Sequence, residues 1–420
     1  MVRLIIADDF TGSNDAGVQF VKKGFTVDVV FDWQSIQPLK THINDKKVMV
    51  VNTESRAIEY HEAQNRIKQV VLNNRHLQPI YKKIDSTLRG NIGGEIETLL
   101  ATTQIKFALV IPAFPNMNRI TKNGKCYVNG IELINTEFAT DPKTPICSSH
   151  IKTIIKQQTD YPCEEINIDK VRTHQIAKCI ENFATQGIKI IIIDAETNHD
   201  LKTIIEQTQG LLDKVLLVGS AGLVEFLSPS MTEKTPKSER LSKKPMLVMA
   251  GSMSEITQQQ INYTIQHDNN WNVIDLKISD LLPELSATTL ITYKNKIQEI
   301  LDNNQHCIVR TSTNKLEREK IDLYCQQYQL SRTELGEKIC SGLGLLVKNI
   351  KFNNLFLTGG DVAISIAKSL GAIGFTIEGQ VCEGVPYGRL LSHEILDYKI
   401  FTKAGGFGTK DIFLKALRFI

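Results

Sequence analysis

Ile5-Ile6-Ala7-Asp8-Asp9-Phe10-Thr11-Gly12 is the stretch that decides how this chain is interpreted, because an apolar run ends there in two acids. Residues 2–7 predict a short buried strand. A helix is predicted over residues 15–23, with Ser13 or Asn14 as its N-cap and Gly24 at its end. Ligands of open α/β sheets bind at the carboxyl ends of strands, so the two acids point to chemistry. The alternative is that both are solvated turn residues and caps.

Composition places the chain among ordinary globular proteins. It has 420 residues, which predicts two or three domains, and it is 42% hydrophobic and 23% charged. The formal net charge is +3 and no long basic block occurs, which argues against nucleic acid as a partner. No apolar stretch approaches the ~18 residues of a membrane span, so no membrane partner is expected.

The cysteines and the start of the chain indicate a reducing compartment. Eight cysteines are scattered without C-x-x-C spacing, and no Cys/His cluster has the spacing of zinc ligands. The first residues run directly into a strand and do not resemble a signal peptide. We therefore expect a cytoplasmic protein with free thiols.

Short apolar runs alternate with helical stretches, which predicts βαβ units and a largely parallel sheet. The predicted strands are residues 27–31, 48–51, 79–84, 107–112, 190–194 and 215–218, then 246–250, 272–276, 306–310 and 355–358. Predicted helices include residues 61–73, 92–103, 256–267, 362–370 and 411–419. The predicted fold class is α/β.

A polar stretch divides the chain. Residues 228–245 (SPSMTEKTPKSERLSKKP) carry three prolines and five basic residues against two acids, as an exposed linker does. We therefore predict two domains, each a largely parallel sheet flanked by helices, with a cleft between them. The predicted boundaries are 1–228 for the first domain, 229–245 for the linker and 246–420 for the second domain.

Three further strand ends in the first half carry polar clusters, at residues 52–56, 82–90 and 112–119. If the strands are parallel, all three lie at the same edge as Asp8 and Asp9. That edge then holds carboxylates beside four cations, namely Arg56, Lys83, Arg89 and Arg119. Mixed charges suit a small, acidic, hydroxylated ligand, because arginine binds a carboxylate with two parallel hydrogen bonds. The alternative is that these charges pair with each other and stabilise the loops.

Three strand ends in the second half carry glycine, at residues 251–254, 358–361 and 403–408. Glycine lets backbone amides approach an anion, and a helix start adds partial positive charge. Asp361 at a helix start repels phosphate unless Mg²⁺ bridges the two or the acid meets a ribose hydroxyl. Neither a P-loop motif nor a G-x-G-x-x-G fingerprint after the first strand occurs.

Taken together and in order, these motifs resemble the four-carbon acid sugar kinase family over nearly the whole chain. They are ADDFTGSNDAG, NTESR, KKIDSTLRGN, IPAFPNMNR with NGKCYVNG, AGSMS, LTGGDVA and KAGGFG. The resemblance implies an N-terminal sugar-acid-binding domain and a C-terminal nucleotide-binding domain. It implies ATP-dependent phosphorylation of the terminal hydroxyl of threonate, erythronate or 3-oxo-tetronate, with Mg²⁺.

The resemblance also implies roles for particular residues. The residues expected to bind the sugar acid are Asp9, Arg56, Lys83, Ile84, Asp85, Ser86 and Arg89. Those expected to bind ATP are Ser252, Ser254, Gly359, Gly360, Asp361, Lys403, Ala404, Gly405 and Gly406. We expect Arg56 and Lys83, with Arg89, to hold the substrate carboxylate, and Asp9 or Asp85 to orient or deprotonate the 4-hydroxyl. The magnesium ligands are not identified.

Two details refine the resemblance. Val362 stands where many relatives have threonine after the TGG-acid string, which weakens the assignment of that loop. KAGGFG looks more like the threonate and erythronate kinases than the 3-oxo-tetronate kinases, whose loop tends toward SGNFG. The resemblance allows a homodimer.

Alternative functions remain at this stage. A 3-oxo-tetronate 4-kinase is the alternative within the family. A sugar-acid dehydrogenase or isomerase fits the acidic loops, but the dinucleotide fingerprint is missing. Two α/β domains joined by a linker also resemble a non-catalytic acid-sugar-binding protein.

Overall fold

A computed structural model describes residues 2–32, 47–75, 77, 79–141, 143–211, 214–227, 244–251, 254–311, 315–392 and 398–420. The chain divides into two compact units, Met1–Glu233 and Lys234–Ile420. Most of the predicted linker lies outside the described residues. None of the helices in the described ranges has the length and apolar character that a bilayer crossing requires.

Parallel strands form the main sheet of the first unit, which confirms the predicted α/β class. The described strands follow the order β2-β3-β1-β4-β11-β5-β10-β9. Their bounds are β1 Leu4–Ala7, β2 Thr26–Val30, β3 Lys47–Asn52, β4 Ile80–Lys83, β5 Phe107–Ile111, β9 Cys163–Ile166, β10 Ile190–Ile193 and β11 Val215–Gly219. Every residue of β1, β4, β10 and β11 is buried, as expected for strands covered on both faces.

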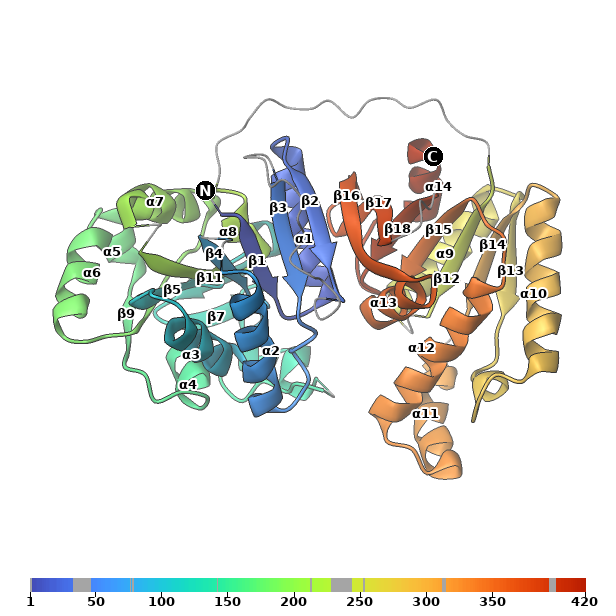
Figure 1. The fold of residues 1–420 in the computed structure, drawn as a ribbon, viewed down its shortest axis with the longest axis horizontal. Helices are drawn as coiled ribbons and strands as arrows, with labels where there is room; N and C mark the ends of the chain where they lie inside the picture. The colour runs from blue at the N-terminus through green and yellow to red at the C-terminus, as the bar shows by residue number, and fades with distance from the viewer. Residues whose placement is uncertain are drawn as a thin grey trace. The chain divides into compact units, whose positions relative to one another are not determined.

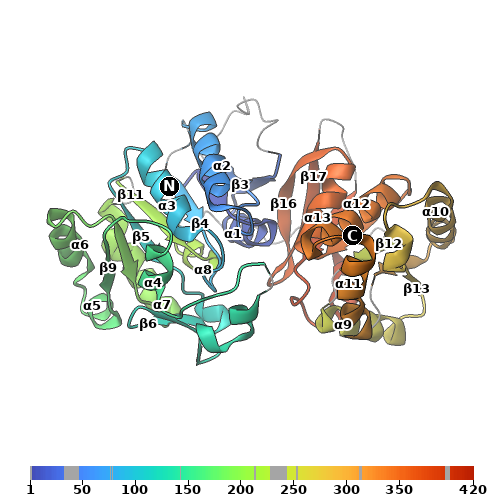
Figure 2. The ribbon, with the colours of Figure 1, turned by 90° about the horizontal axis from the view of Figure 1, so that it is seen from below.

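Helices cover both faces of this sheet (Figures 1 and 2). Their bounds are α1 Phe10–Lys22, α2 Tyr60–Asn73, α3 Ile92–Thr102, α4 Ile151–Lys156, α5 Ile168–Arg172, α6 Ile176–Thr185, α7 Asn198–Thr208 and α8 Ala221–Val224. Helices α2 and α4 both pack on α3, whereas α1 and α7 both pack on α8. Helix α2 buries Ala63, Ile67, Val70 and Val71, the apolar side that the sequence predicted.

The predicted start of the first helix was wrong. Helix α1 begins at Phe10, and its N-cap is Asp9, whose carboxylate accepts a hydrogen bond from the Gly12 amide at 2.9 Å. Neither Ser13 nor Asn14 is the cap, because Asp9 already has the extended backbone that a cap requires. The strand and the helix are therefore joined by Asp8 and Asp9 alone.

A small antiparallel sheet, which was not predicted, follows β5. It consists of β6 Arg119–Lys122, β7 Lys125–Val128 and β8 Ile131–Glu132. Four 3-10 helices complete the described part of this unit, η1 Pro115–Met117, η2 Leu133–Asn135, η3 Glu137–Thr140 and η4 Gln209–Leu211.

The second unit repeats the α/β plan with one antiparallel hairpin. Its described strands follow the order β13-β14-β12-β15-β18-β17-β16, and those from β13 to β18 in that order are parallel. They span β12 Met246–Ala250, β13 Trp271–Asp275, β14 His306–Arg310, β15 Asn354–Thr358, β16 Ala372–Cys382, β17 Val385–Ser392 and β18 Lys399–Lys403. The β16–β17 hairpin was not predicted.

Helices of the second unit again form two layers. Helices α10 and α13 pack on α12, while α14 packs on α9. Their bounds are α9 Glu255–His267, α10 Ala287–Asp302, α11 Lys315–Tyr328, α12 Arg332–Lys348, α13 Gly360–Ser369 and α14 Ile412–Ala416, with η5 Ile278–Leu281 and η6 Leu417–Phe419. Phe356, Phe401 and Phe413 form a buried aromatic group between the sheet and α14.

Both units place their first strand at a topological switch point. In the first unit β1 lies between β3 and β4, and in the second β12 lies between β14 and β15. The chain runs from the first strand to the outer strand on one side, β2 or β13, returns to the inner strand, β3 or β14, and then crosses to the other side of the first strand. Ligands of such sheets bind outside the carboxyl ends of the strands at this point.

Candidate active site

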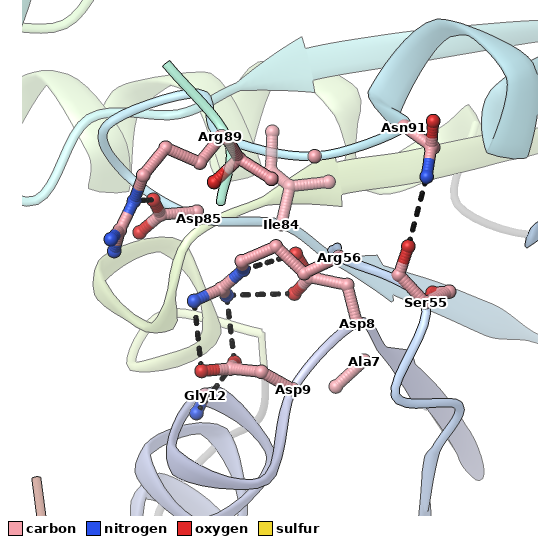
Figure 3. A network of polar contacts seen from close by, with 12 residues as sticks. Ala7, Asp8, Asp9, Gly12, Ser55, Arg56, Ile84, Asp85, Arg89 and Asn91 are labelled. Atoms are coloured by element: carbon pink, nitrogen blue, oxygen red, sulfur yellow. Dashed lines mark hydrogen bonds and ion pairs between the residues drawn. The ribbon is translucent and has the colours of Figure 1, made fainter. Parts of the chain in front are cut away.

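A guanidinium joined to two carboxylates forms the centre of the first unit's carboxyl edge (Figure 3). Arg56 donates to Asp8 through Nε at 2.8 Å and Nη2 at 3.0 Å. The same guanidinium contacts Asp9 through Nη1 at 2.8 Å and Nη2 at 2.7 Å. Three of the five N–H donors of Arg56 thus form hydrogen bonds, and Nη2 makes a further ion-pair contact with Asp9. This pairing counts against the expected grip of Arg56 on a substrate carboxylate, because all three nitrogens of its guanidinium already contact a protein carboxylate.

Backbone contacts bring these three residues together. The register aligns Ala7 of β1 with Asn52 of β3, so the two strands end side by side. The Asp8 carbonyl then accepts hydrogen bonds from the amides of Ser55 and Arg56. Glu54 adopts a left-handed φ of 49°, which turns the loop back toward β1. The loop after β3 is thus held against the loop after β1.

A buried network beneath the loop fixes it further. Lys82 and Glu95 form an ion pair at 2.8 Å with both side chains essentially inaccessible. Ser55 donates to Glu95, and the Thr53 hydroxyl donates to the Ala7 carbonyl at 2.9 Å. Burial raises the pKa of Glu95 despite the adjacent Lys82. Because Lys82 and Glu95 are inaccessible to solvent, we interpret these contacts as structural support for the loop at residues 53–56.

A second ion-paired group follows β4. Arg89 donates through Nε to Asp85 at 2.6 Å and through Nη1 to Asp141 at 2.9 Å. The Thr87 hydroxyl also donates to Asp85, at 2.6 Å. Asp141 was not identified from the sequence, because it belongs to no motif and lies 52 positions from Arg89. Both predicted arginines therefore have carboxylate partners within the protein.

The two candidate base carboxylates differ in proton affinity. Burial raises the pKa of Asp9, and the neighbouring Asp8 and Asp85 add to this, so that Arg56 and Lys83 do not bring it back to its ordinary value. For Asp85 burial acts in the same direction, but Arg56, Arg89 and the hydrogen bonds from Arg89 and Thr87 outweigh it and hold its pKa far below its usual range. The pKa of Asp8 is lowered in the same way, chiefly by Arg56 acting against burial.

Lys83 lies beside Asp9. Its ammonium donates to the Ile84 carbonyl at 2.8 Å and sits so close to Gly12 that a Cβ on that glycine would lie 2.6 Å from Nζ. The same hypothetical Cβ would lie 2.5 Å from Asp9 Oδ1. Glycine at position 12 therefore leaves room for both charged groups. Ile84 takes part through its backbone, and its side chain is fully buried.

A cavity of about 330 Å³ opens next to this cluster. Arg56, Leu88, Gly90 and Asn91 line it, together with residues 143–147. None of Asp8, Asp9, Lys83 and Asp85 lines this cavity. We therefore assign the candidate reaction site to the charged edge rather than to the cavity.

The three glycine loops of the second unit meet at the equivalent edge. Register pairs Ala250 of β12 with Thr358 of β15, and Thr358 with Lys403 of β18. The loops after these strands are thus neighbours. A Cβ on Gly251 would lie 2.4 Å from Val362 Cγ2, so the first loop packs directly on the start of α13. The departure at Val362 is thereby explained as an apolar contact between two loops.

The second glycine loop has a backbone that other residues adopt poorly. Gly359, the N-cap of α13, has φ 101° and ψ 127°. Gly360 and Asp361 then form the first turn of α13, whose amides face the carboxyl edge of the sheet. The Thr358 hydroxyl is buried without a hydrogen-bond partner among the described residues. An unsatisfied hydroxyl beside a helix N-terminus fits a site for a phosphorylated ligand.

Lys403 holds the third glycine loop together. Its ammonium donates to the carbonyls of Ala404 at 3.1 Å and Gly405 at 2.9 Å, and to the Thr257 hydroxyl at 3.1 Å. Burial lowers its pKa to about 7. Gln260 of α9 donates to the carbonyls of Phe407 and Gly408. Thr257 and Gln260 were not identified from the sequence, because helix α9 carries no recognisable motif.

The remaining residues that were predicted to bind ATP lie in different parts of these loops. Ser254 is the N-cap residue of α9, directly after the first glycine loop, and Gly406 lies at the exposed tip of the third loop. Ser252 lies outside the described residues. Within the described ranges no group of three or more His, Cys, Asp or Glu is arranged to hold a metal ion. Magnesium held mainly by nucleotide phosphates needs only one or two carboxylates, and Asp361 can supply one.

Fold and sites together define a two-domain α/β enzyme that combines a sugar-binding and a nucleotide-binding domain. Residues 3–227 match a family model described as a sugar-binding N-terminal domain, and residues 247–413 match a nucleotide-binding C-terminal domain. The chain belongs to the four-carbon acid sugar kinase family, as its motifs predicted.

Relatives of known function extend over the whole chain. It is 37% identical to a D-threonate kinase of Salmonella typhimurium, covering 100% of this chain and 98% of the relative. It is 29% identical to a D-erythronate kinase of Heliobacterium modesticaldum, over 97% and 94%. A 3-oxo-tetronate kinase of Salmonella typhimurium is 24% identical, over 99% and 98%.

Solved structures support the fold. A Salmonella typhimurium protein superposes with a TM-score of 0.83 at 22% identity, covering 99% of both chains. A Haemophilus influenzae protein superposes with a TM-score of 0.76 at 21% identity, covering 98% of both chains.

Proposed function

We propose that this protein is an ATP-dependent kinase that transfers a phosphoryl group to the terminal 4-hydroxyl of a four-carbon acid sugar. The observation that supports the proposal is that both units place polar groups at the carboxyl ends of the strands beside the topological switch point. In the first unit that edge holds the acids and cations around Asp9 and Lys83. In the second it holds three neighbouring glycine loops at a helix N-terminus.

We assign the domains as they were predicted from the sequence. Residues 1–228 bind the sugar acid, residues 246–420 bind the nucleotide, and residues 229–245 link them. Phosphoryl transfer depends on positioning and charge stabilisation, so the proposal requires the two edges to face one another during turnover. Exclusion of water at that stage prevents hydrolysis of ATP.

Asp9 is the better of the two candidate bases. Its pKa is raised by burial and by neighbouring carboxylates, which makes it a stronger proton acceptor than an ordinary aspartate. The carboxylate of Asp85 has a strongly lowered pKa and is occupied by Arg89 and Thr87. Asp85 therefore orients neighbouring groups. Arg56 holds Asp9 in place, and Lys83, Ser86 and Arg89 surround the substrate.

At the nucleotide edge, the amides at the start of α13 and the loop held by Lys403 bind the phosphates of ATP. Mg²⁺, when bound with ATP, neutralises phosphate charge and aligns the γ-phosphoryl group. Asp361 stands where it can hold that ion at the helix start. We call the start of α13 and the third glycine loop the phosphate cradle. Because Lys403 donates hydrogen bonds to its own loop, we propose that it stabilises the shape of this cradle.

D-threonate is the first substrate to test. Identity is higher to the D-threonate and D-erythronate kinases than to the 3-oxo-tetronate kinase. The KAGGFG ending points in the same direction. D-erythronate and L-threonate follow, and 3-oxo-tetronate is the alternative.

The test is ADP release from protein, ATP and Mg²⁺ with each acid in turn. The proposal predicts release that depends on one four-carbon acid and is absent without it. Binding of an acid without ADP release would instead support a non-catalytic binding protein. Oxidation of an acid with a nicotinamide cofactor would support a dehydrogenase. The homodimer remains a prediction that sedimentation velocity can test.

A further inference from the structure

The cations at the first unit's edge differ in their partners. Arg56 contacts Asp8 and Asp9, and Arg89 contacts Asp85 and Asp141. Arg119, in contrast, has no carboxylate within ion-pair distance among the residues that the structure describes. Its Nη1 donates to the Ser86 hydroxyl at 2.5 Å. Among the described residues, Arg119 and Lys83 are therefore the two of these four cations that no carboxylate neutralises directly.

One donor of Arg119 has no acceptor among the described residues. Its Nε is buried and has no hydrogen-bond partner in the described part of the chain. A buried, charged N–H group without an acceptor is unfavourable, so such groups in native proteins usually have a partner. A bound anion would supply that partner. Nε and the adjacent Nη2 form the side-on pair of donors that a carboxylate binds with two parallel hydrogen bonds.

The backbone of Arg119 is held rigidly. Arg119 and Phe114 exchange hydrogen bonds, with the Phe114 amide donating at 2.7 Å and the Arg119 amide at 3.2 Å. Asn118 adopts a left-handed φ of 53° and closes the turn. The side chain therefore leaves the edge after β5 from a fixed position, as a ligand-binding group should.

An aromatic ring orients the guanidinium. The Cζ of Arg119 lies 5.8 Å from the centroid of Phe138, and the Cζ of Arg89 lies 5.2 Å from the same centroid. Cation–π attraction thus holds both arginines on one ring. Arg89 already has two carboxylate partners, one of them on its Nε, whereas Arg119 has none among the described residues, so Arg119 is the better placed of the two to bind an external anion.

We propose that Arg119 binds the carboxylate of the sugar acid and so makes the enzyme select an acid over its neutral counterpart. The inference rests on the proposed function and changes the expected role of Arg56. Arg56, whose three guanidinium nitrogens all contact Asp8 or Asp9, positions Asp9, and the substrate carboxylate meets Arg119 with Lys83 nearby. Ser86, held by Arg119, connects this group to the loop after β4.

The test compares two ligands on the full chain without ATP. Calorimetric titrations of D-threonate and of its neutral primary amide, D-threonamide, are run on the wild type and on Arg119→Gln. We expect Arg119→Gln to weaken D-threonate binding by about 10- to 100-fold while D-threonamide binding stays within about twofold. Arg119→Lys keeps the charge but loses the paired donors of the guanidinium, so its affinity for D-threonate should lie between those of the wild type and Arg119→Gln.

Arg172→Gln is the matched control. Arg172 is an arginine of the same unit with two carboxylate partners, Asp200 and Glu196, and belongs to no proposed site. It should leave the affinities for both ligands unchanged. Melting temperatures show whether each variant is folded, and Arg119→Lys replaces Arg119→Gln in the comparison if the latter unfolds.

Two results would overturn the inference. Equal weakening of both ligands would mean that Arg119 only shapes the loop, and no weakening of D-threonate would mean that it does not meet the ligand. Failure of the proposed function looks different, because the wild type itself would then release no ADP with any four-carbon acid, whether or not it binds one.

Discussion

Arg56 and Asp9 lie 47 positions apart in the chain, yet the guanidinium of one contacts both carboxylate oxygens of the other, at 2.8 and 2.7 Å. The same carboxylate caps helix α1 through the Gly12 amide. Asp9 is therefore held in one orientation by a strand-end loop and by a helix start. Preorganisation of this kind is what a group acting on a substrate hydroxyl requires.

Asp9→Asn should lower the single-turnover rate of phosphoryl transfer at least ~10²-fold, because the amide cannot accept the proton. Asparagine remains a good N-cap, so the fold should persist. Asp85→Asn is the comparison and should keep a larger share of the rate. A rate in Asp9→Asn within tenfold of the wild type would remove Asp9 from the mechanism.

The rate of transfer should fall as the pH is lowered through the pKa of Asp9. Because burial and neighbouring carboxylates raise that pKa, the acid limb should lie at higher pH than an ordinary aspartate would give. A profile of kcat/KM between pH 4 and 8 measures it. A limb at or below the ordinary range of aspartate would contradict the assignment of Asp9 as base.

Arg56→Gln should destabilise the protein and slow phosphoryl transfer. Asp8, whose side chain is 2% exposed, would lose its counter-charge, which typically costs about 3–5 kcal/mol. Chemical unfolding measures this loss, and Arg332→Gln, at an exposed pair with Asp322, should change stability by less than ~0.5 kcal/mol. In folded Arg56→Gln the rate of phosphoryl transfer should fall, because Asp9 loses the partner that orients it, while the KM for ATP is kept. Unchanged kinetics would exclude a role of Arg56 in positioning Asp9.

Gly359→Ala tests whether the start of α13, part of the phosphate cradle, binds ATP. At φ 101° an alanine is strained by about 1–3 kcal/mol, and the shift of the loop should raise the KM for ATP. Gly336→Ala is the matched control, since that glycine lies inside α12 with open space around it. It should stabilise the protein by about 0.5–1 kcal/mol and leave KM unchanged. Equal effects of both changes would argue against the cradle.

Lys403 should make stability depend on pH. Its pKa is about 7 in the folded protein, well below that of an unfolded lysine. Between these values the unfolded chain holds a proton that the folded protein does not, so stability rises with pH above 7, by about 1.4 kcal/mol per unit. Urea unfolding at pH 6 to 9 should show this slope in the wild type relative to Lys403→Met. Parallel curves for the two proteins would contradict it.

Much of the fold was predictable because parallel strands are buried on both faces and read as apolar runs. Residues 306–310 match β14 without any shift, and Asp8 and Asp9 lie at a strand end, as proposed. The start of α1 was misplaced because Asp9, interpreted as a functional acid, is also a cap. The β16–β17 hairpin was missed, since its buried and half-buried positions follow no regular alternation and its register shifts three times.

The sequence predicted which charged residues lie at the carboxyl edge of the first unit. It did not predict which of them form ion pairs with one another. Parallel strands bring Arg56, Arg89 and Arg119 to one edge whatever their pairing. Which arginine remains available depends on Asp8, Asp9 and Asp141, and these contacts join residues about 50 positions apart. Sequence order carries no information on such pairing, so the availability of Arg119 follows from the coordinates alone.

The central claim is that a phosphoryl group passes from ATP to the terminal hydroxyl of a four-carbon acid. Its most direct test is ³¹P and ¹³C NMR of the product formed from D-threonate, ATP and Mg²⁺. The account predicts one phosphate monoester whose phosphorus couples to C4 and its protons, formed in equal amount with ADP. Phosphate on another carbon, or ADP with only inorganic phosphate, would contradict it.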